Sequence, residues 1–213
     1  MASYGGKGVK FLSNPTKNEL NDYFDKLEEE NLIFQETVKQ SKETAKLHPD
    51  SLNTIRIMTL IIDGEVKVLP WCAFRMGIGK SKVDNASFGG IYCKIEEDGT
   101  LSNFAYDALG NRFNKHPDGG DFFNVKFAFM DKVKKLVKEA AQRFPHFRLT
   151  GWDIAISEEN EPIIIEANLT MSGMDVIETI CGPLFGEYTE KVLEEVFLKK
   201  HKKKTSMDIS QYV

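Results

Sequence analysis

Two carboxylates and one amide in this chain have the residue types of a metal site: Asp153, Glu166 and Asn168. Around them, residues 151–156 and 162–168 have the composition of two short strands joined by a polar turn. Side chains alternate between the two faces of a strand, so Glu166 and Asn168 share one face of the second strand. We therefore expect a hairpin that presents acidic and amide side chains together.

The register of this hairpin decides whether its two carboxylates meet. If Ser157 pairs with Pro162 across the turn, Asp153 lies directly opposite Glu166. Negative charges that face each other on a sheet repel, and an unpaired charge among apolar neighbours is costly. A divalent cation removes this conflict, and two carboxylates with an amide oxygen suit Mg²⁺. The alternative interpretation is a half-exposed hairpin whose acidic side chains face water.

Two arginines occupy positions in the predicted β-hairpin formed by residues 53–62 and 65–75. Arg56 interrupts an apolar strand between Ile55 and Ile57, and an arginine in such a strand is rarely buried without a partner. Arg75 ends the next predicted strand, a position where a lone arginine is usually a solvated surface charge. The polar, glycine-rich loop 77–90 follows, and its length and composition favour a functional loop over a plain connector.

The beginning of the chain offers a possible phosphate contact in the glycine-rich loop formed by Gly5, Gly6, Lys7 and Gly8. Glycines let backbone N–H groups approach a phosphate closely, and a lysine adds positive charge. The loop lacks the spacing of a Walker motif, and a flexible terminal turn is the alternative. Residues 35–38 would suit a hinge beside a nucleotide base, or form a simple strand-to-helix junction.

Hydrophobic periodicity predicts the elements that must position these residues. Strands are predicted at 9–12, 32–35, 53–62, 65–75, 90–96, 101–106, 151–156 and 162–168. Helices are predicted at 14–29, 36–47, 128–144, 175–181 and 187–201, with loops at 77–90, 114–121 and 170–175. The strongest turn signal is Asp63-Gly64, between two predicted strands. The expected fold is α+β, with an antiparallel sheet and flanking helices.

Composition bounds the class of protein. The chain has 213 residues, 41% of them hydrophobic, and a net charge of −4, which describes an ordinary globular protein. It has no apolar run of membrane-spanning length and no signal-peptide core. Its three cysteines are widely spaced and indicate neither a disulfide framework nor a zinc motif. We expect a cytoplasmic protein without a nucleic-acid partner, since the basic run 199–204 is typical of a solvated helix end.

These pieces together resemble the ATP-grasp superfamily, and within it the sugar-transfer-associated group linked to surface polysaccharides. They occur in the order of that family across nearly the whole chain, although each piece alone is weak. The residues that carry the resemblance are GGKGV (5–9), QETV (35–38), SLNTIRI (51–57), Arg75 with VDNASFGGI (83–91), HPD (116–118), GWDIAI (151–156) and IIEAN (164–168).

The resemblance implies which residues contact ATP and Mg²⁺. The glycines and Lys7 match the mobile loop over the phosphates, and the segment that lines the adenine is matched by Gln35, Glu36 and Val38. The family's metal ligands are matched by Asp153, Glu166 and Asn168. Positive charge near the phosphates or the acyl group is supplied at the positions of Arg56 and Arg75, and Asn85 lies in the matching loop.

The resemblance also implies an activity. ATP-grasp proteins hold ATP between two α+β subdomains and typically join a carboxylate to an amine or similar nucleophile through an acyl-phosphate. A small-molecule carboxylate and a nucleophilic acceptor are then the substrates, in surface polysaccharide biosynthesis. Residues 1–34 would be part of the small subdomain, 35–204 the C-terminal subdomain with the metal site, and 205–213 a polar tail.

Two departures from the family bear on this interpretation. The family has an N-terminal domain and lysines before the glycine loop, whereas this sequence opens at the loop. Gly151 stands where the related D-alanine–D-alanine ligases carry an arginine. We therefore expect the C-terminal part of a ligase: a fragment, the product of a split gene whose partner chain supplies the missing domain, or a degenerate copy. The alternative is a non-catalytic module that binds nucleotide or completes a partner.

Overall fold

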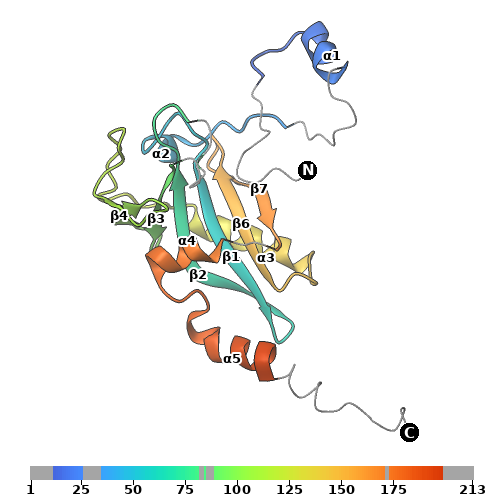
Figure 1. Cartoon of the computed structure of the whole chain (residues 1–213), viewed down its shortest axis with the longest axis vertical. Helices are drawn as coiled ribbons and strands as arrows, with labels where there is room; N and C mark the ends of the chain where they lie inside the picture. Colours follow the sequence, from blue (N-terminus) through green and yellow to red (C-terminus); the bar gives the residue numbers. More distant parts are fainter. Residues whose placement is uncertain (1–11, 26–34, 82–83, 85–88, 171–172, 199–213) are drawn as a thin grey trace.

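One antiparallel sheet forms the centre of the computed structural model, which describes residues 12–25, 35–81, 84, 89–170 and 173–198. Its seven strands follow the order β5-β4-β3-β2-β1-β6-β7, and all six neighbouring pairs are antiparallel (Figure 1). The strands are β1 (Thr54–Ile62), β2 (Glu65–Met76), β3 (Ile91–Ile95), β4 (Leu101–Tyr106), β5 (Arg112–Phe113), β6 (Leu149–Ile156) and β7 (Pro162–Asn168). The predicted α+β fold with flanking helices is confirmed.

The hairpin of β1 and β2 places its two strands in the middle of the sheet. Asp63 and Gly64 at its tip have φ values of 53° and 78°, the positive values that a two-residue primed turn requires. Because β1 pairs with β2 on one side and β6 on the other, nearly all of its side chains are buried. An unpaired charge on β1 would therefore be costly.

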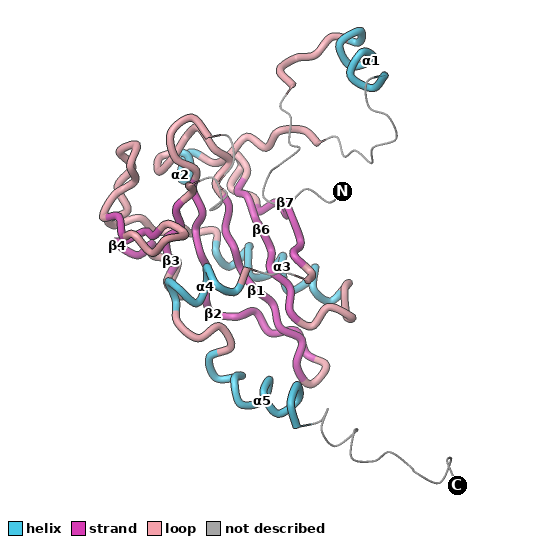
Figure 2. The backbone as a smooth tube through the Cα atoms, viewed as in Figure 1, coloured by secondary structure: helices cyan, strands magenta, loops and turns pink. Residues whose placement is uncertain are grey.

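Alternation of side chains along the strands builds two separate cores. On one face, strand residues such as Phe74 and Trp152 pack with Val133 and Val137 of α3 (Met130–Gln142). The apolar stripe of α3 is the one that period 3.6 predicts, and this helix lies behind the sheet in Figure 2.

The opposite face of the sheet carries the smaller core. Met58 and Ala73 pack there with Ile177 of α4 (Met174–Cys181) and with Leu184. After α4 the chain continues through a 3₁₀ turn, α5 (Thr189–Leu193) and a π-helical turn at Glu194–Leu198. The helix predicted over 187–201 is therefore present in its described part, 187–198, but its pitch changes from 3₁₀ through α to π. No helix of the described part is long and apolar enough to cross a bilayer.

The region before the sheet differs most from expectation. Helix α1 (Lys17–Asp25) begins at a capping box in which Thr16 and Glu19 bond each other's backbone N–H groups, and it buries no side chain. Of the helix predicted over 36–47, only α2 (Lys42–Ala45) forms.

The reason for the short α2 is a competing set of hydrogen bonds. Gln40 forms a bridge with Ser157, and the N–H of Ser41 donates to the carbonyl of Ile156 (2.8 Å), so this segment extends the end of β6. The side chain of Gln40 also donates to the carbonyl of Ser51 (2.7 Å). Of the strand predicted over 32–35, only Gln35 lies within the described residues, and it is irregular.

Candidate functional site

The sheet face that α4 covers is apolar at one end and charged at the other. Along β1 the same alternation leads from Met58, in the core, to Arg56 and Thr54. Along β2 it leads from Ala73 to Arg75. Thr54, Arg56 and Arg75 therefore lie beside the small core, on one side of the sheet.

Asp153 of β6 holds both arginines. Arg56 is its cross-strand neighbour on β1, and the guanidinium donates from Nε to Oδ1 and from Nη2 to Oδ2, the latter at 2.9 Å. Arg75 reaches over from β2 and donates from Nη1 to Oδ2 at 2.8 Å. Asp153 is 5% and Arg56 8% exposed, so these are buried, charge-assisted contacts. The expectation that Arg56 has a buried partner is confirmed.

A second carboxylate, Asp84, joins the group from the loop after β2. Asp84 accepts a hydrogen bond from Thr54 Oγ1, and its Oδ1 lies 3.6 Å from Arg75 Nη2. Arg75 thus lies between Asp84 and Asp153. Asp84 is not among the site residues predicted from the sequence, although it lies in the loop 77–90 that was predicted to be functional.

The electrostatics of the two carboxylates differ. Burial alone would raise the pKa of Asp153, but the charges and hydrogen bonds of Arg75 and Arg56 outweigh burial and lower it. For Asp84, burial outweighs the charge of Arg75 and the hydrogen bond from Thr54, so its pKa is raised. Burial opposes the charged form of Arg75, yet Asp84, Asp153 and then Glu166 raise its pKa. Asp153 is therefore the firmly ionised partner of the arginines.

The predicted meeting of Asp153 with Glu166 is confirmed, because these two residues are cross-strand partners in β6 and β7. The pairing from which that prediction started is wrong. Pro162 pairs with Ile156 rather than with Ser157, so the strand next to the turn is displaced by one residue.

A β-bulge restores the predicted alignment farther from the turn. Ile154 pairs with Ile164, but the next residue, Asp153, pairs with Glu166, so β7 contributes Ile165 as an extra residue. Without the bulge, side chains beyond it would change faces. The bulge is what brings the second acidic side chain opposite the arginine-bound one.

The third predicted ligand, Asn168, is the cross-strand partner of Gly151 on the same hairpin, two positions from Glu166. Glu166 is exposed and Asn168 half-buried. Two carboxylates and an amide oxygen on neighbouring strands are hard oxygen donors that fit Mg²⁺. A carboxylate has about four lone-pair sites, so Asp153 can accept from arginines and still offer an oxygen to a cation.

Gly173, just before α4, lies directly against the guanidinium of Arg56. A Cβ at this position would lie 2.5 Å from Arg56 Nη1, and the backbone has a φ of +65°. Only glycine satisfies both conditions easily, since it has no Cβ and tolerates positive φ. From the sequence, Gly173 was predicted only to lie in the loop 170–175.

The other predicted site residues lie apart from the arginine pair or outside the described part. Gln35 and Glu36 are exposed and Val38 is half-buried, on the irregular segment that reaches the sheet at the bridge of Gln40 with Ser157. That bridge lies at the same end of β6 as Asp153. Five further predicted residues fall outside the described residues: Gly5, Gly6, Lys7, Gly8 and Asn85.

Comparison with known proteins gives a family for this arrangement. Among protein-family models, the one described as sugar-transfer associated ATP-grasp matches residues 23–188. No curated protein and no solved structure gives a significant match. The family match covers the whole sheet, the arginine-bound carboxylate and Glu166, and it makes this a nucleotide-binding ATP-grasp region. The chain therefore belongs to the sugar-transfer associated ATP-grasp family.

Proposed function

We propose that this chain binds ATP with Mg²⁺ at the charged end of the sheet, as the nucleotide-binding part of a carboxylate ligase. The observation that supports this is the buried contact of Arg56 and Arg75 with Asp153, with Glu166 opposite. In a member of an ATP-grasp family, such a group combines phosphate-binding guanidiniums with oxygen ligands for a cation. The predicted ligands Asp153, Glu166 and Asn168 would hold the metal.

The two guanidiniums would recognise the triphosphate. They share one carboxylate, and phosphate oxygens are acceptors of the same kind and geometry. When a polyphosphate takes the place of Asp153 on Arg56 and Arg75, Asp153 is released to bind a cation beside Glu166. We therefore expect nucleotide and cation to bind together more tightly than either binds alone.

The proposed reaction has two steps. A substrate carboxylate oxygen attacks the γ-phosphorus of ATP, the bond to the β,γ-bridging oxygen breaks, and ADP leaves. An amine or similar nucleophile then attacks the acyl-phosphate carbonyl, inorganic phosphate leaves, and the nucleophile loses its proton. Arg56 and Arg75 would stabilise negative charge on the transferred phosphoryl group. Asp153, Glu166 and Asn168 would hold Mg²⁺, which would supply positive charge to neutralise the phosphates.

Three finer parts of the proposal rest on the family resemblance alone. They are a role in surface polysaccharide biosynthesis, a cytoplasmic location, and a partner chain that supplies an N-terminal ATP-grasp domain. Copurification of the chain from its source organism tests the partner directly, because a stable complex would carry a second ATP-grasp polypeptide.

Calorimetric titration with ATP, with and without Mg²⁺, tests the binding proposal. We expect Mg²⁺-dependent binding that Glu166→Gln weakens by about tenfold or more, because the substitution removes a ligand charge without changing shape. Glu158→Gln is the matched control, since Glu158 is an exposed residue in the turn of the same hairpin. Unchanged affinity in the Glu166 variant, or equal loss in both variants, would contradict the assigned site.

A non-catalytic nucleotide-binding or partner-completing module is the second candidate. The observation that favours it is that Asp153 already pairs with both arginines, as in an ion-pair network whose role is structural. The two candidates separate in an assay of ADP release with a range of carboxylates and amines. Magnesium-dependent ATP binding without turnover, in the presence of any partner chain, would select the module.

A further inference from the structure

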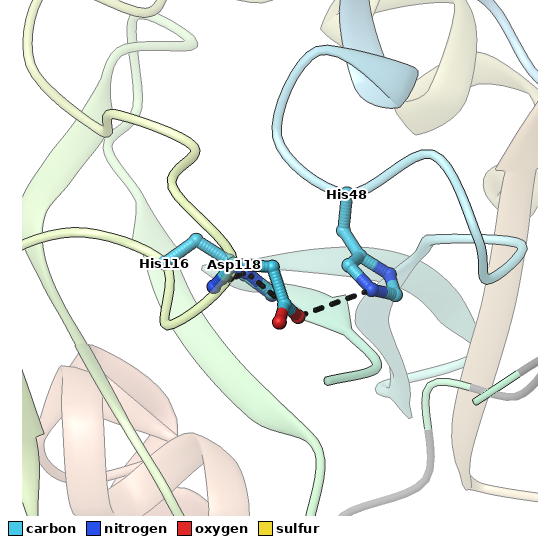
Figure 3. A group of neighbouring side chains, drawn as sticks. All are labelled: His48, His116 and Asp118. Atoms are coloured by element: carbon cyan, nitrogen blue, oxygen red, sulfur yellow. Dashed lines mark hydrogen bonds and ion pairs between the residues drawn. The ribbon is translucent and has the colours of Figure 1, made fainter. Parts of the chain in front are cut away.

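A second group of polar side chains lies outside the arginine site and consists of His48, His116 and Asp118. The histidines are 1% and 0% exposed, whereas the Asp118 side chain is 41% exposed. Figure 3 shows the Asp118 carboxylate between the two imidazoles, which come from different loops. The rings stack with their centroids 4.7 Å apart. Two buried imidazoles with an accessible carboxylate are a donor set for a transition metal.

The hydrogen bonds of His116 decide which of its nitrogens can bind a metal. Its Nε2 lies 2.8 Å from the carbonyl oxygen of Gly77, which can only accept, so Nε2 carries the proton. Nδ1 is then the nitrogen with a lone pair; it accepts from the backbone N–H of Asp118 at 3.1 Å, and Asp118 Oδ2 lies 3.5 Å away. A metal ion on Nδ1 would take the place of that N–H. Burial lowers the pKa of His116, which favours the neutral imidazole that metals require.

The same reasoning applies to His48. Its Nδ1 lies 2.8 Å from Ser51 Oγ, and that hydroxyl donates its proton to Asn53 Oδ1 at 2.9 Å. Ser51 Oγ must therefore accept from His48 Nδ1; the backbone N–H of Ser51 is a longer contact to this nitrogen, at 3.3 Å. Nε2 is then the nitrogen that is left for a proton or a metal ion. In both histidines the outer nitrogen donates to the protein, as in metal-binding histidines.

The inner nitrogen of His48 faces acceptors only. Its Nε2 lies 3.0 Å from the carbonyl oxygen of Gly79 and 3.4 Å from Asp118 Oδ2. A nitrogen that faces a carbonyl and a carboxylate carries either a proton, as His116 Nε2 does toward Gly77, or a metal ion. Asp118 is itself oriented by the N–H of Gly79, which donates to Oδ2 at 2.6 Å.

The distances from Asp118 Oδ2 to the two imidazole nitrogens fit a shared metal ion better than direct hydrogen bonds. Separations of 3.4 and 3.5 Å between the imidazole nitrogens and Asp118 Oδ2 exceed the usual hydrogen-bond range. Zinc bonds of about 2.0–2.1 Å in a tetrahedron place neighbouring ligands about 3.3–3.4 Å apart. All three ligand atoms lie within 4.8 Å of one another.

We propose that His48 Nε2, His116 Nδ1 and Asp118 together bind one transition-metal ion, with Zn²⁺ the best-fitting ion. Two imidazoles and one carboxylate are typical zinc ligands, and a water or the Gly79 carbonyl would complete the tetrahedron. Imidazoles are poor ligands for Mg²⁺, so the site is distinct from the oxygen ligands around Asp153. The ion would fasten the loop before β1, which carries His48, to the loop 114–121. If the Gly79 carbonyl is the fourth ligand, the ion would also hold the start of the loop after β2, which leads to Asp84.

Zinc titration of the full chain tests the proposal, after treatment with a chelator and in excess Mg²⁺. Wild type should bind one Zn²⁺ per chain and unfold at a higher temperature with zinc. Asp118→Asn should lower the zinc affinity by at least about tenfold, since loss of an outer partner alone costs that much. Asparagine at position 118 keeps an oxygen that can accept from the N–H of Gly79, so the stability of this variant without zinc should stay near that of wild type.

Asp121→Asn is the matched control, an exposed aspartate in the same loop, and should bind zinc like wild type. Absence of zinc binding by folded wild type would overturn the proposal, as would equal affinity in the Asp118 variant. If Asp118→Asn does not fold, X-ray absorption of the wild-type chain with substoichiometric zinc decides. Two imidazoles and oxygen ligands are expected, and a sulfur ligand would overturn the proposal by locating the metal at a cysteine.

Discussion

Asp153→Asn and Asp84→Asn should have unequal effects on stability, although both aspartates lie beside Arg75. Asp153 accepts three hydrogen bonds from two guanidiniums while it is 5% exposed, and asparagine would remove the charge that both arginines face. Removing one partner of a buried ion pair costs about 3–5 kcal/mol. Arg75 keeps Asp84 as a neighbour, so we expect a loss of about 3 kcal/mol.

Asp84→Asn should change the free energy of unfolding by about 1 kcal/mol or less. Its ionised form already suffers from burial, as the raised pKa indicates, and asparagine still accepts from Thr54. Urea unfolding followed by the fluorescence of buried Trp152 measures both variants. For the Asp153 variant, the midpoint should fall by roughly 1–3 M, given m values of about 1–3 kcal/mol/M.

The pH dependence of stability provides a second test of the role assigned to Asp153. Because the pKa of Asp153 is lowered in the folded chain, its stabilisation is present above the ordinary value of 3.8 and is lost as pH falls through the folded value. The stability difference between wild type and Asp153→Asn should therefore stay constant from about pH 5 to 8 and shrink below about pH 4. Equal destabilisation by the two aspartate variants, or no such pH dependence, would refute the assigned roles.

Three further outcomes are expected. Arg56→Ala should weaken ATP binding more than adenosine binding, because the guanidinium faces phosphate rather than base; equal weakening in calorimetry would count against that role. Gly173→Ala should destabilise more than Gly186→Ala in urea, since both have positive φ but only Gly173 has Arg56 within contact of an added Cβ. Burial raises the pKa of Cys72 and Cys181 to about 12, so native thiols should react slowly with iodoacetamide at pH 8 and quickly in urea; equal rates would exclude this burial.

Local patterns explain why much of the fold was predictable. Period-two alternation and the Asp63-Gly64 turn lie within single hairpins, so β1, β2 and the Asp153 hairpin follow from neighbouring residues. The apolar stripe of α3 is equally local. The position of Arg56 in an apolar strand predicted a buried partner, although not which residue would provide it.

Contacts between distant segments explain what the sequence did not predict. That Arg75 meets Asp153 depends on the order β2-β1-β6, which no local pattern specifies. Asp84 becomes a site residue only because its loop returns to Thr54. The predicted helix over 36–47 failed because Gln40 bonds to segments eight or more residues away, which outweighs local helix preference. The zinc proposal likewise joins two loops far apart in sequence.

The extra residue Ile165 affects which mutations the hairpin of β6 and β7 can tolerate during evolution. Only the part of the hairpin between the turn and the bulge follows the alignment set by the turn; Asp153 and Glu166 lie beyond it. If one residue were deleted from the turn, the hairpin could still keep Asp153 opposite Glu166 by also losing the bulge. In a hairpin without the bulge, this alignment of the two acids is the one that pairs Ser157 with Pro162. Substitution and length change in 157–161 should therefore be tolerated in a mutational scan better than any change in 165–166.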